Sequence, residues 1–335
     1  MLNVLKLVAW GLFLPLLMLP HALFSQACCS GGVPISSNLG LGASTAGTFQ
    51  FQLTYDHNTL KDLLASSERL DDDRRTRNTR SLILETSYDI NQAFSVSALF
   101  SLVRQERIIL TQANTEDITI NNGVGDGIVL LRYNFLHGEK HPDIDFMLGA
   151  GPKFPFGQAN FTDERGITLP ADLQPGTGAW DAIIWTNFNR RGLMRDNLSF
   201  NVSATYRLTG TNPDYNGSLA YKFGNEFQIQ WGVQDRFLIG SLIIDPIIAF
   251  QYRTVGVDQI DGNRFENTGG HWLNFRPGLN FNLGQNSALR LTGALPIYRY
   301  LQGTQLSTSY RFAITFYQSL GLQKKNDSPF KGLAK

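Results

Sequence analysis

The chain has 335 residues, a formal charge of +1, 17% charged and 12% aromatic residues, and 32 glycines. It is therefore poor in charge and rich in Phe and Gly for a soluble domain. Its near-neutral charge, with no basic run interleaved with aromatic residues, excludes a nucleic-acid-binding protein from the candidate classes.

Residues 1–27 have the pattern of a secretory signal peptide. Lys6 precedes an apolar core over residues 7–19, and Ser25-Gln26-Ala27 supplies a small-x-small cleavage site. The apolar core is too short to cross a bilayer as a helix, and no later segment has about 18 uninterrupted apolar residues. A membrane-embedded form of this chain would therefore have to be a β-barrel.

Two cysteines, Cys28 and Cys29, follow the cleavage site directly and open a Gly- and Ser-rich leader over residues 28–47. Three interpretations stay open: a lipid-modified Cys28, a metal or redox pair, or inert residues at a processed terminus. Ser25 stands where a lipobox usually has Leu, and no further cysteine supplies a closed ligand set. Both observations favour the inert interpretation.

From residue 48 onward the side chains alternate between apolar and polar with period two, which indicates β-strands. Residues 197–209 show the pattern most clearly, because Phe200 and Tyr206 share one face while Asn201 and Arg207 share the other. The expected strands are residues 48–56, 79–90, 93–106, 127–136, 144–154, 177–188, 197–209, 218–234, 242–255, 272–283, 288–300 and 309–320.

The connections between these strands mostly alternate between long and short. Long ones begin at residues 57, 107, 158 and 256, and short ones at residues 91, 137, 189, 235 and 284. An outer-membrane barrel has short periplasmic turns and long external loops, which puts both termini in the periplasm. The run LDDDRRTR in the first long loop either stays solvated or contacts lipopolysaccharide phosphates through Arg74, Arg75 and Arg77.

We therefore expect an all-β fold, a transmembrane antiparallel up-and-down β-barrel of about 12 strands (10–14) over residues 48–321, with a periplasmic tail at 322–335. Each expected strand has about the 9–11 residues, or more, that a tilted strand needs to cross a bilayer. A secreted sandwich or solenoid would also alternate, but it would have turns of similar length at both ends and fewer large aromatic residues in each strand.

Three segments in this order resemble one family: GDGIVLLRYNFL from residue 125, LGAGPKFPFG from residue 148 and GTGAWDAIIW from residue 176. The chain from residue 123 onward is similar to the outer-membrane barrels of the MetA pathway of phenol degradation family. The resemblance implies a transporter for aromatic or other hydrophobic small molecules, with no catalytic residues. Its matching positions, read first as structural, are Gly151, Lys153, Gly176, Gly178 and Asp181, and an interior ion pair between Lys153 and Asp181 is expected.

If the apolar face of each strand contacts lipid, the opposite face lines the lumen. Basic residues outnumber acidic ones on that face, which favours a water-filled, mildly anion-selective pathway. The alternative is that these charges pair into ladders that fill a narrow barrel and close it. The lumen-lining residues expected on this basis are Glu85, Arg132, Asp145, Lys153, Asp181, Arg207, Lys222, Glu226, Asp245, Arg253, Arg276, Arg290 and Arg311.

The sequence carries no catalytic motif of a known class: it has no Gly-x-Ser-x-Gly elbow, no His-Glu-x-x-His and no P-loop. His271, on the lipid-facing side of its strand, is the one candidate for a Ser–His lipid hydrolase. We expect no enzyme activity, no cofactor and no metal.

The predicted function is an outer-membrane channel that passes small hydrophobic or anionic solutes by passive diffusion. Its partners would be outer-membrane lipid, lipopolysaccharide and the solute. The alternatives are a plugged structural or adhesive barrel and an outer-membrane lipid hydrolase. The solute, the oligomeric state and the position of the leader relative to the lumen stay open.

Overall fold

The computed structural model describes residues 26–27, 41, 46–136 and 143–321. Cys28 and Cys29, most of the predicted signal peptide and leader, and the tail at 322–335 lie outside the described residues. None of the helices found in the described part of the chain is long and apolar enough to cross a membrane.

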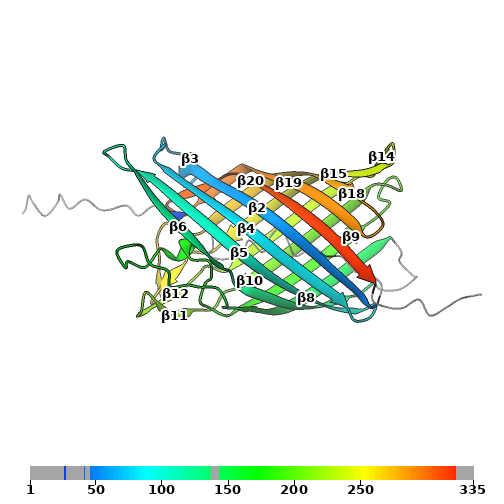
Figure 1. Cartoon of the computed structure of the whole chain (residues 1–335), viewed down its shortest axis with the longest axis horizontal. Coiled ribbons are helices and arrows are strands. Elements are labelled where there is room, and N and C mark those ends of the chain that lie inside the picture. The colour runs from blue at the N-terminus through cyan, green and yellow to red at the C-terminus, as the bar shows by residue number, and fades with distance from the viewer. Residues whose placement is uncertain (1–25, 28–40, 42–45, 137–142, 322–335) are drawn as a thin grey trace, which may run out of the picture.

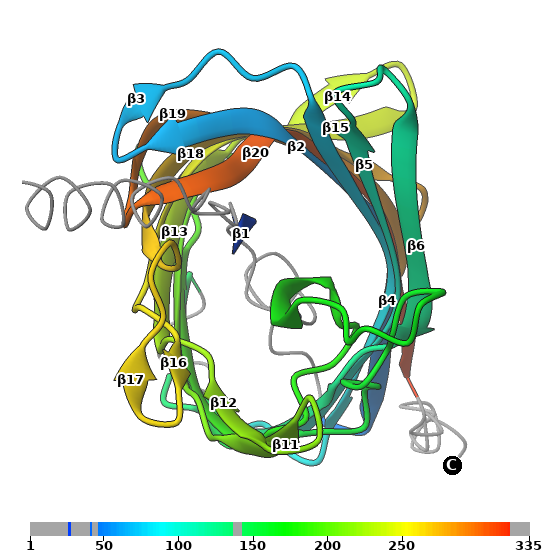
Figure 2. The ribbon, with the colours of Figure 1, turned by 90° about the vertical axis from the view of Figure 1, so that its left-hand side faces the viewer.

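Twelve antiparallel strands form a closed barrel, which confirms the predicted fold class (Figures 1 and 2). The barrel closes where the first and last strands pair, from Thr48 opposite Gly321 to Ala65 opposite Thr304. Its strands in chain order are β2 (Thr48–Ala65), β4 (Arg75–Asp89), β5 (Phe94–Leu110), β7 (Gly127–Asn134), β8 (Ile144–Phe154), β9 (Asp181–Arg190), β10 (Ser199–Leu208), β13 (Glu226–Gln234), β15 (Leu242–Val255), β18 (Gly270–Asn282), β19 (Ser287–Leu301) and β20 (Thr304–Gly321).

Short strands extend the edges of this barrel. β3 (Glu68–Arg69) pairs with β2, β6 (Glu116–Val124) with β5, and β14 (Phe237–Ile239) with β15. β1 (Gln26–Ala27) pairs in parallel with β20 at Gln305 and Leu306.

Burial is inverted relative to a soluble protein. On β2, Gln50 and Gln52 are 1% and 8% exposed, whereas Leu53 and Tyr55 are 41% and 39% exposed. The same alternation recurs on β4, where Glu85 is buried and Leu84 is exposed. Apolar side chains outside and polar side chains inside are the arrangement of a membrane barrel.

The connections separate into two ends. The short-turn end carries the connections after β4, β7, β9, β13 and β18, and the long-loop end carries those after β2, β5, β8, β10, β15 and β19 (Figure 1). Strands at the long-loop end run further than predicted, because β2 reaches Ala65 and β5 reaches Leu110. Side chains on both faces can be polar where a strand leaves the apolar layer, so the alternation that marked these strands ends before their hydrogen bonds do.

A second sheet of four short strands lies at the long-loop end (Figure 2). We call it the outer sheet; it comprises β11 (Asn212–Tyr215), β12 (Leu219–Lys222), β16 (Gln259–Ile260) and β17 (Asn263–Arg264). The predicted single strand over residues 218–234 is wrong for this reason, since β12 belongs to the outer sheet and only β13 to the barrel. Lys222 is therefore not on the barrel wall.

Candidate functional site in the barrel interior

The inner wall of the barrel is built from polar side chains that bond one another across neighbouring strands. Gln52 Nε2 donates to Glu85 Oε2 at 2.6 Å, between β2 and β4. Arg311 on β20 pairs with Asp56 on β2, at 2.8 Å from Nε to Oδ2. Each carboxylate thus receives a donor within the wall, as buried polar groups require.

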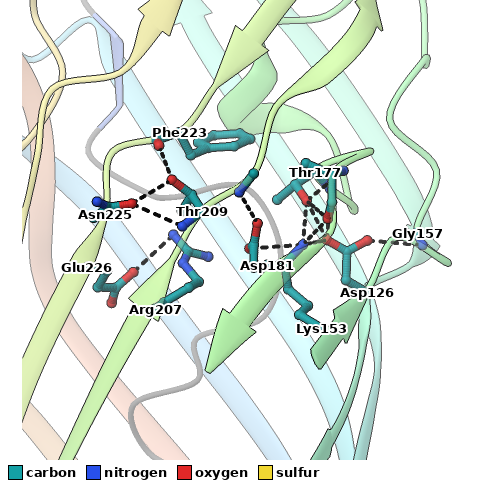
Figure 3. Close-up of polar contacts among 12 residues, drawn as sticks. Asp126, Lys153, Gly157, Thr177, Asp181, Arg207, Thr209, Phe223, Asn225 and Glu226 are labelled. Atoms are coloured by element: carbon teal, nitrogen blue, oxygen red, sulfur yellow. Dashed lines mark hydrogen bonds and ion pairs between the residues drawn. The ribbon is translucent and has the colours of Figure 1, made fainter. Parts of the chain in front are cut away.

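Lys153 forms the densest charged cluster of the interior (Figure 3). Its Nζ lies 2.6 Å from Asp126 Oδ2 and 3.1 Å from Asp181 Oδ2, and it also donates to Thr177 Oγ1 at 2.5 Å and to the Ala179 carbonyl at 2.9 Å. Lys153 and Asp181 are register partners on β8 and β9, so the predicted ion pair between them forms.

The connection between β8 and β9 folds into the barrel instead of standing outside it. Figure 2, which looks into the barrel from the long-loop end, shows its short 3-10 helix η3 (Ala171–Leu173) projecting into the interior. The two ends of this inward-folded segment meet at a contact that we call the neck, where Gly176 N donates to the Gln158 carbonyl at 2.9 Å. A Cβ on Gly176 would lie 2.5 Å from the backbone of Gly157, so this close approach requires glycine. We call residues 159–175 the inward loop.

Arg77 fixes the inward loop to the wall. Its Nη1 lies 2.7 Å from Asp172 Oδ2, and its Nη2 donates to Gln105 Oε1 at 2.7 Å and to the Asp172 carbonyl. Asn121 Nδ2 donates to the Leu173 carbonyl at 2.9 Å. Both interpretations of Arg77 from the sequence, solvation and lipopolysaccharide contact, are wrong, because this residue is 1% exposed and bonded inside the barrel.

A second charged group lies on the wall beside the Lys153 cluster (Figure 3). Glu226 accepts from two arginines: Arg207 Nη2 lies 3.2 Å from Oε2, and Arg253 Nε lies 2.7 Å from Oε1. The guanidinium of Arg253 also lies over the ring of Trp272, 5.1 Å from its centroid. One carboxylate is thus shared by two cations.

Arg132 contacts Leu41, the one residue between 28 and 45 that the structure describes. Its Nη1 donates to the Leu41 carbonyl at 2.7 Å, its Nη2 donates to Ser87 Oγ, and its guanidinium lies 5.8 Å from the ring centroid of Trp185. Leu41 is 2% exposed. At this point, therefore, the leader contacts the inner wall.

A cavity of about 480 Å³ occupies the half of the barrel toward the short-turn end. Residues of nine strands line it, from β2 around to β20, so it belongs to the barrel lumen. Its charged lining residues are Asp145, Arg191, Asp196, Arg236, Arg276 and Arg290.

Two of these cations are neutralised by carboxylates. Arg191 Nη1 lies 2.9 Å from Asp145 Oδ2, and Arg236 Nε lies 2.9 Å from Asp245 Oδ1. Asp245 accepts further bonds from the amides of Asn280 and Asn282.

The remaining two are not neutralised in this way. Arg276 Nη1 donates to Gln230 Oε1 at 2.8 Å, and within the described residues Arg290 has no hydrogen-bond or ion-pair partner. Four arginines and two aspartates line the cavity, so its lining carries an excess of positive charge.

The structure brings most of the predicted lumen residues to the inner wall, in groups that the sequence does not reveal. Twelve of the thirteen lie on barrel strands, and the exception is Lys222. The groups are Gln52 with Glu85; Lys153 with Asp181; Arg207 and Arg253 with Glu226; Asp145 with Arg191; Asp245 with Arg236; Arg311 with Asp56; and Arg132, Arg276 and Arg290, which bond no carboxylate among the described residues.

Several wall residues were missed. Asp56 is the last residue of the predicted strand 48–56 and lies on the same face as Gln50 and Gln52, so the alternation already placed it on the lumen side. Asp126 and Asp172 lie in connections, outside any alternating run, so only the folded chain reveals their contacts with Lys153 and Arg77.

His271 does not form the Ser–His pair of a lipid hydrolase within the described residues. Its Nδ1 lies 3.0 Å from the Tyr252 hydroxyl, and its ring packs between Tyr252 and Tyr300. An aromatic belt residue makes contacts of this kind.

The outer sheet contains a buried phenol–carboxylate pair. The Tyr221 hydroxyl donates to Asp258 Oδ2 at 2.6 Å, and Gly224 N donates to Asp258 Oδ1 at 2.7 Å. Burial raises the pKa of the Asp258 carboxyl, and burial together with the Asp258 charge raises the pKa of the Tyr221 phenol. Burial also raises the pKa of Tyr215, which packs on Tyr221, to about 12.

Comparisons with known proteins identify the architecture. No protein-family model matches the chain, and no curated protein matches it. Among solved structures, the COG4313 outer membrane channel from Pseudomonas putida F1 superposes with a TM-score of 0.64 at 15% identity, covering 83% of this chain and 97% of that one. This chain has the fold of an outer-membrane β-barrel channel.

Two further structures are similar at a lower level. The transport unit of the autotransporter AIDA-I from Escherichia coli gives a TM-score of 0.44 at 12% identity, covering 85% of this chain and 94% of that one. The Ralstonia pickettii toluene transporter TbuX gives 0.38 at 9% identity, covering 83% and 90%. At these scores the two comparisons carry no argument about function, and the family named from the sequence motifs stays a prediction.

Proposed function

We propose that this protein is an outer-membrane channel that passes small anionic or hydrophobic solutes by passive diffusion. The observation that carries the proposal is the cavity in a closed barrel, lined by polar side chains and two arginines without a carboxylate partner. Selection would come from the width of the lumen and the charge of its wall, without covalent chemistry.

The proposed orientation puts the short-turn end in the periplasm. The barrel begins at Thr48 and ends at Gly321, which are register partners at that end. Short turns face the periplasm in outer-membrane barrels, so both ends of the barrel domain would lie there. The division into a signal peptide at 1–27, a leader at 28–47, a barrel at 48–321 and a tail at 322–335 is part of the same proposal.

The inward loop favours a second candidate function, a plugged structural barrel. Leu169, Leu173 and Gln174 are between 1% and 5% exposed, and the Arg77–Asp172 pair holds this segment inside the long-loop end. A loop fixed in this way either sets the size limit of an open channel or closes it.

Liposome swelling distinguishes the two candidates. The mature protein is refolded into vesicles and compared with a variant in which a short glycine turn joins Gln158 to Gly176 in place of the inward loop. The neck bond between these two residues makes the deletion compatible with the barrel. If the protein is a channel, the wild type should admit small anions. The deletion variant should then admit larger anions faster than the wild type does.

The control is Arg104→Gln, an exposed arginine on β5 that lies outside the inward loop's contacts. It should swell vesicles at the wild-type rate. Vesicles that stay impermeable with the wild type, but become permeable with the deletion variant, would support the plugged barrel instead.

A further inference from the structure

A row of small side chains crosses the inner wall of the cavity. Gly278 on β18 is in register with Thr292 on β19, and Thr292 is in register with Ala313 on β20. Beside this row, Gly232 on β13 is in register with Ala249 on β15. Four of these five residues, Gly232, Ala249, Thr292 and Ala313, line the cavity directly. The two sets are offset by two residues, because Ala249 is in register with Arg276 and Gly278 with Ile247. Small side chains on five neighbouring strands thus leave room beside Arg276 on the inner wall.

Arg276 and Arg290 flank the row on its two sides. Arg276 precedes Gly278 by two residues toward the long-loop end, and Arg290 precedes Thr292 by two residues toward the short-turn end. Side chains two residues apart on a strand share a face, so both arginines point into the cavity with the row. Both are lining residues.

Within the described residues, neither arginine forms an ion pair with a carboxylate at bonding distance. The positive charges of Arg290 and Arg311 and the negative charge of Asp56 all act on Arg276, and the negative charge of Asp245 acts on Arg290. Arg276 bonds a neutral amide, Gln230, and Arg290 bonds no described residue. The inner-wall arginines at the long-loop end are bonded to carboxylates, as Arg77 and Arg207 illustrate.

We propose that the cavity is a binding site for an organic carboxylate. The carboxylate would accept hydrogen bonds from Arg276 or Arg290, and its apolar body would lie over the small-residue row. An arginine forms strong, charge-assisted bonds to carboxylates because its planar donors match the two oxygens. The site deepens the proposed function and rests on it, since it assigns a solute class to the channel.

Isothermal titration calorimetry on the refolded full chain in detergent micelles tests the site, with empty micelles as the blank. The probes are benzoate, which has a carboxylate and a flat apolar body; benzamide, its neutral counterpart; and acetate, which lacks the body. Benzoate should bind more tightly than either. Arg290→Gln should weaken benzoate binding by about tenfold or more, as expected for a lost bond between charged groups.

The charge-matched control is Arg195→Gln, which removes an exposed arginine outside the cavity lining. It should leave benzoate binding unchanged, and Arg290→Lys should retain part of it. Because Arg290 bonds no other residue in the part of the chain that the structure describes, loss of folding is not expected, and circular dichroism checks this. Equal binding of benzamide and benzoate, equal losses in the Arg195 and Arg290 variants, or no benzoate binding to the wild type would each overturn the site.

Conductance measured separately keeps the two proposals distinguishable. A channel that conducts but does not bind benzoate contradicts the site and leaves the channel function standing. A barrel that binds benzoate in an Arg290-dependent manner but does not conduct contradicts the channel function and retains the site.

Discussion

Lys153 can stay charged inside the barrel because two carboxylates surround it. Its side chain is 4% exposed, and those of Asp126 and Asp181 are each 2% exposed. The three charges come from a connection and two strands, so the cluster also fixes the end of β8 against the chain that enters β9. Removing the lysine would leave two buried carboxylates without a cation, the costly case for a buried ion pair.

We expect Lys153→Met to destabilise the barrel by about 3–5 kcal/mol, the usual cost of removing one partner of a buried pair. Urea unfolding of the protein in detergent, followed by tryptophan fluorescence, measures it. Lys222→Met is the matched control, because Lys222 lies on the outer sheet and forms no ion pair among the described residues. Similar unfolding midpoints for the two variants would show that the Lys153 cluster does not stabilise the fold.

At the scale of elements, the pairing of β19 with β20 stops before these strands reach the long-loop end. Their register partners run from Ser287 opposite Gln318 only as far as Ala294 opposite Arg311. Beyond that point, Arg299 Nη1 donates to the Thr308 carbonyl at 3.0 Å and pairs with Asp62 Oδ2 at 2.6 Å. One side chain thus bridges a stretch that backbone hydrogen bonds leave open.

Removing this bridge should selectively loosen the part of β20 that lies toward the long-loop end. In Arg299→Ala, we expect faster deuterium uptake over residues 304–310 and unchanged uptake over residues 311–318, where the backbone ladder to β19 persists. Hydrogen exchange with mass spectrometry reports both segments. Deuterium uptake that rises equally in both segments, or in neither, would mean that Arg299 does not hold β19 and β20 together where their backbones do not pair.

The outer sheet should weaken at alkaline pH. A phenol with a raised folded pKa is bound to its proton more tightly in the folded state, so its contribution is complete below its ordinary pKa of about 10. That contribution is lost as the pH rises from there toward the folded value, which is about 12 for Tyr215. Tyr221 acts in the same direction.

Limited proteolysis of the outer sheet at rising pH measures this effect. Cleavage between residues 211 and 223 should accelerate above pH about 10 in the wild type, and less so in Tyr215→Phe, which cannot ionise. The cleavage rate is normalised to that of a peptide substrate, which corrects for the protease's own pH dependence. A pH response equal in both proteins would exclude the phenol as its cause.

The sequence predicts the elements better than the contacts between them. Alternation at Phe200, Asn201 and Arg207 suffices to identify β10 and its two faces, because period two follows from backbone geometry alone. It fails at Lys222, where the chain leaves the barrel although the alternation continues. It also fails at Asp172, because nothing in a polar loop sequence reveals that the loop turns inward to reach Arg77.

At the scale of the whole molecule, the barrel is asymmetric along its axis. The long-loop end holds the inward loop and the charge groups of Arg77, Lys153 and Glu226, whose members neutralise one another in large part. The short-turn end holds the cavity, whose lining has four arginines and two aspartates and includes Arg276 and Arg290. A solute crossing the proposed channel would meet the inward loop and its ion pairs at one end, and a cavity lined by more arginines than aspartates at the other.

The most direct test of this account is the reversal potential of the refolded mature protein in a planar bilayer under a KCl gradient. We predict steady single-channel conductance with a preference for anions, and a shift toward cations in Arg276→Glu/Arg290→Glu. A conducting channel whose selectivity does not change in that variant would contradict the role given to the cavity arginines. A folded barrel with no conductance would contradict the channel itself.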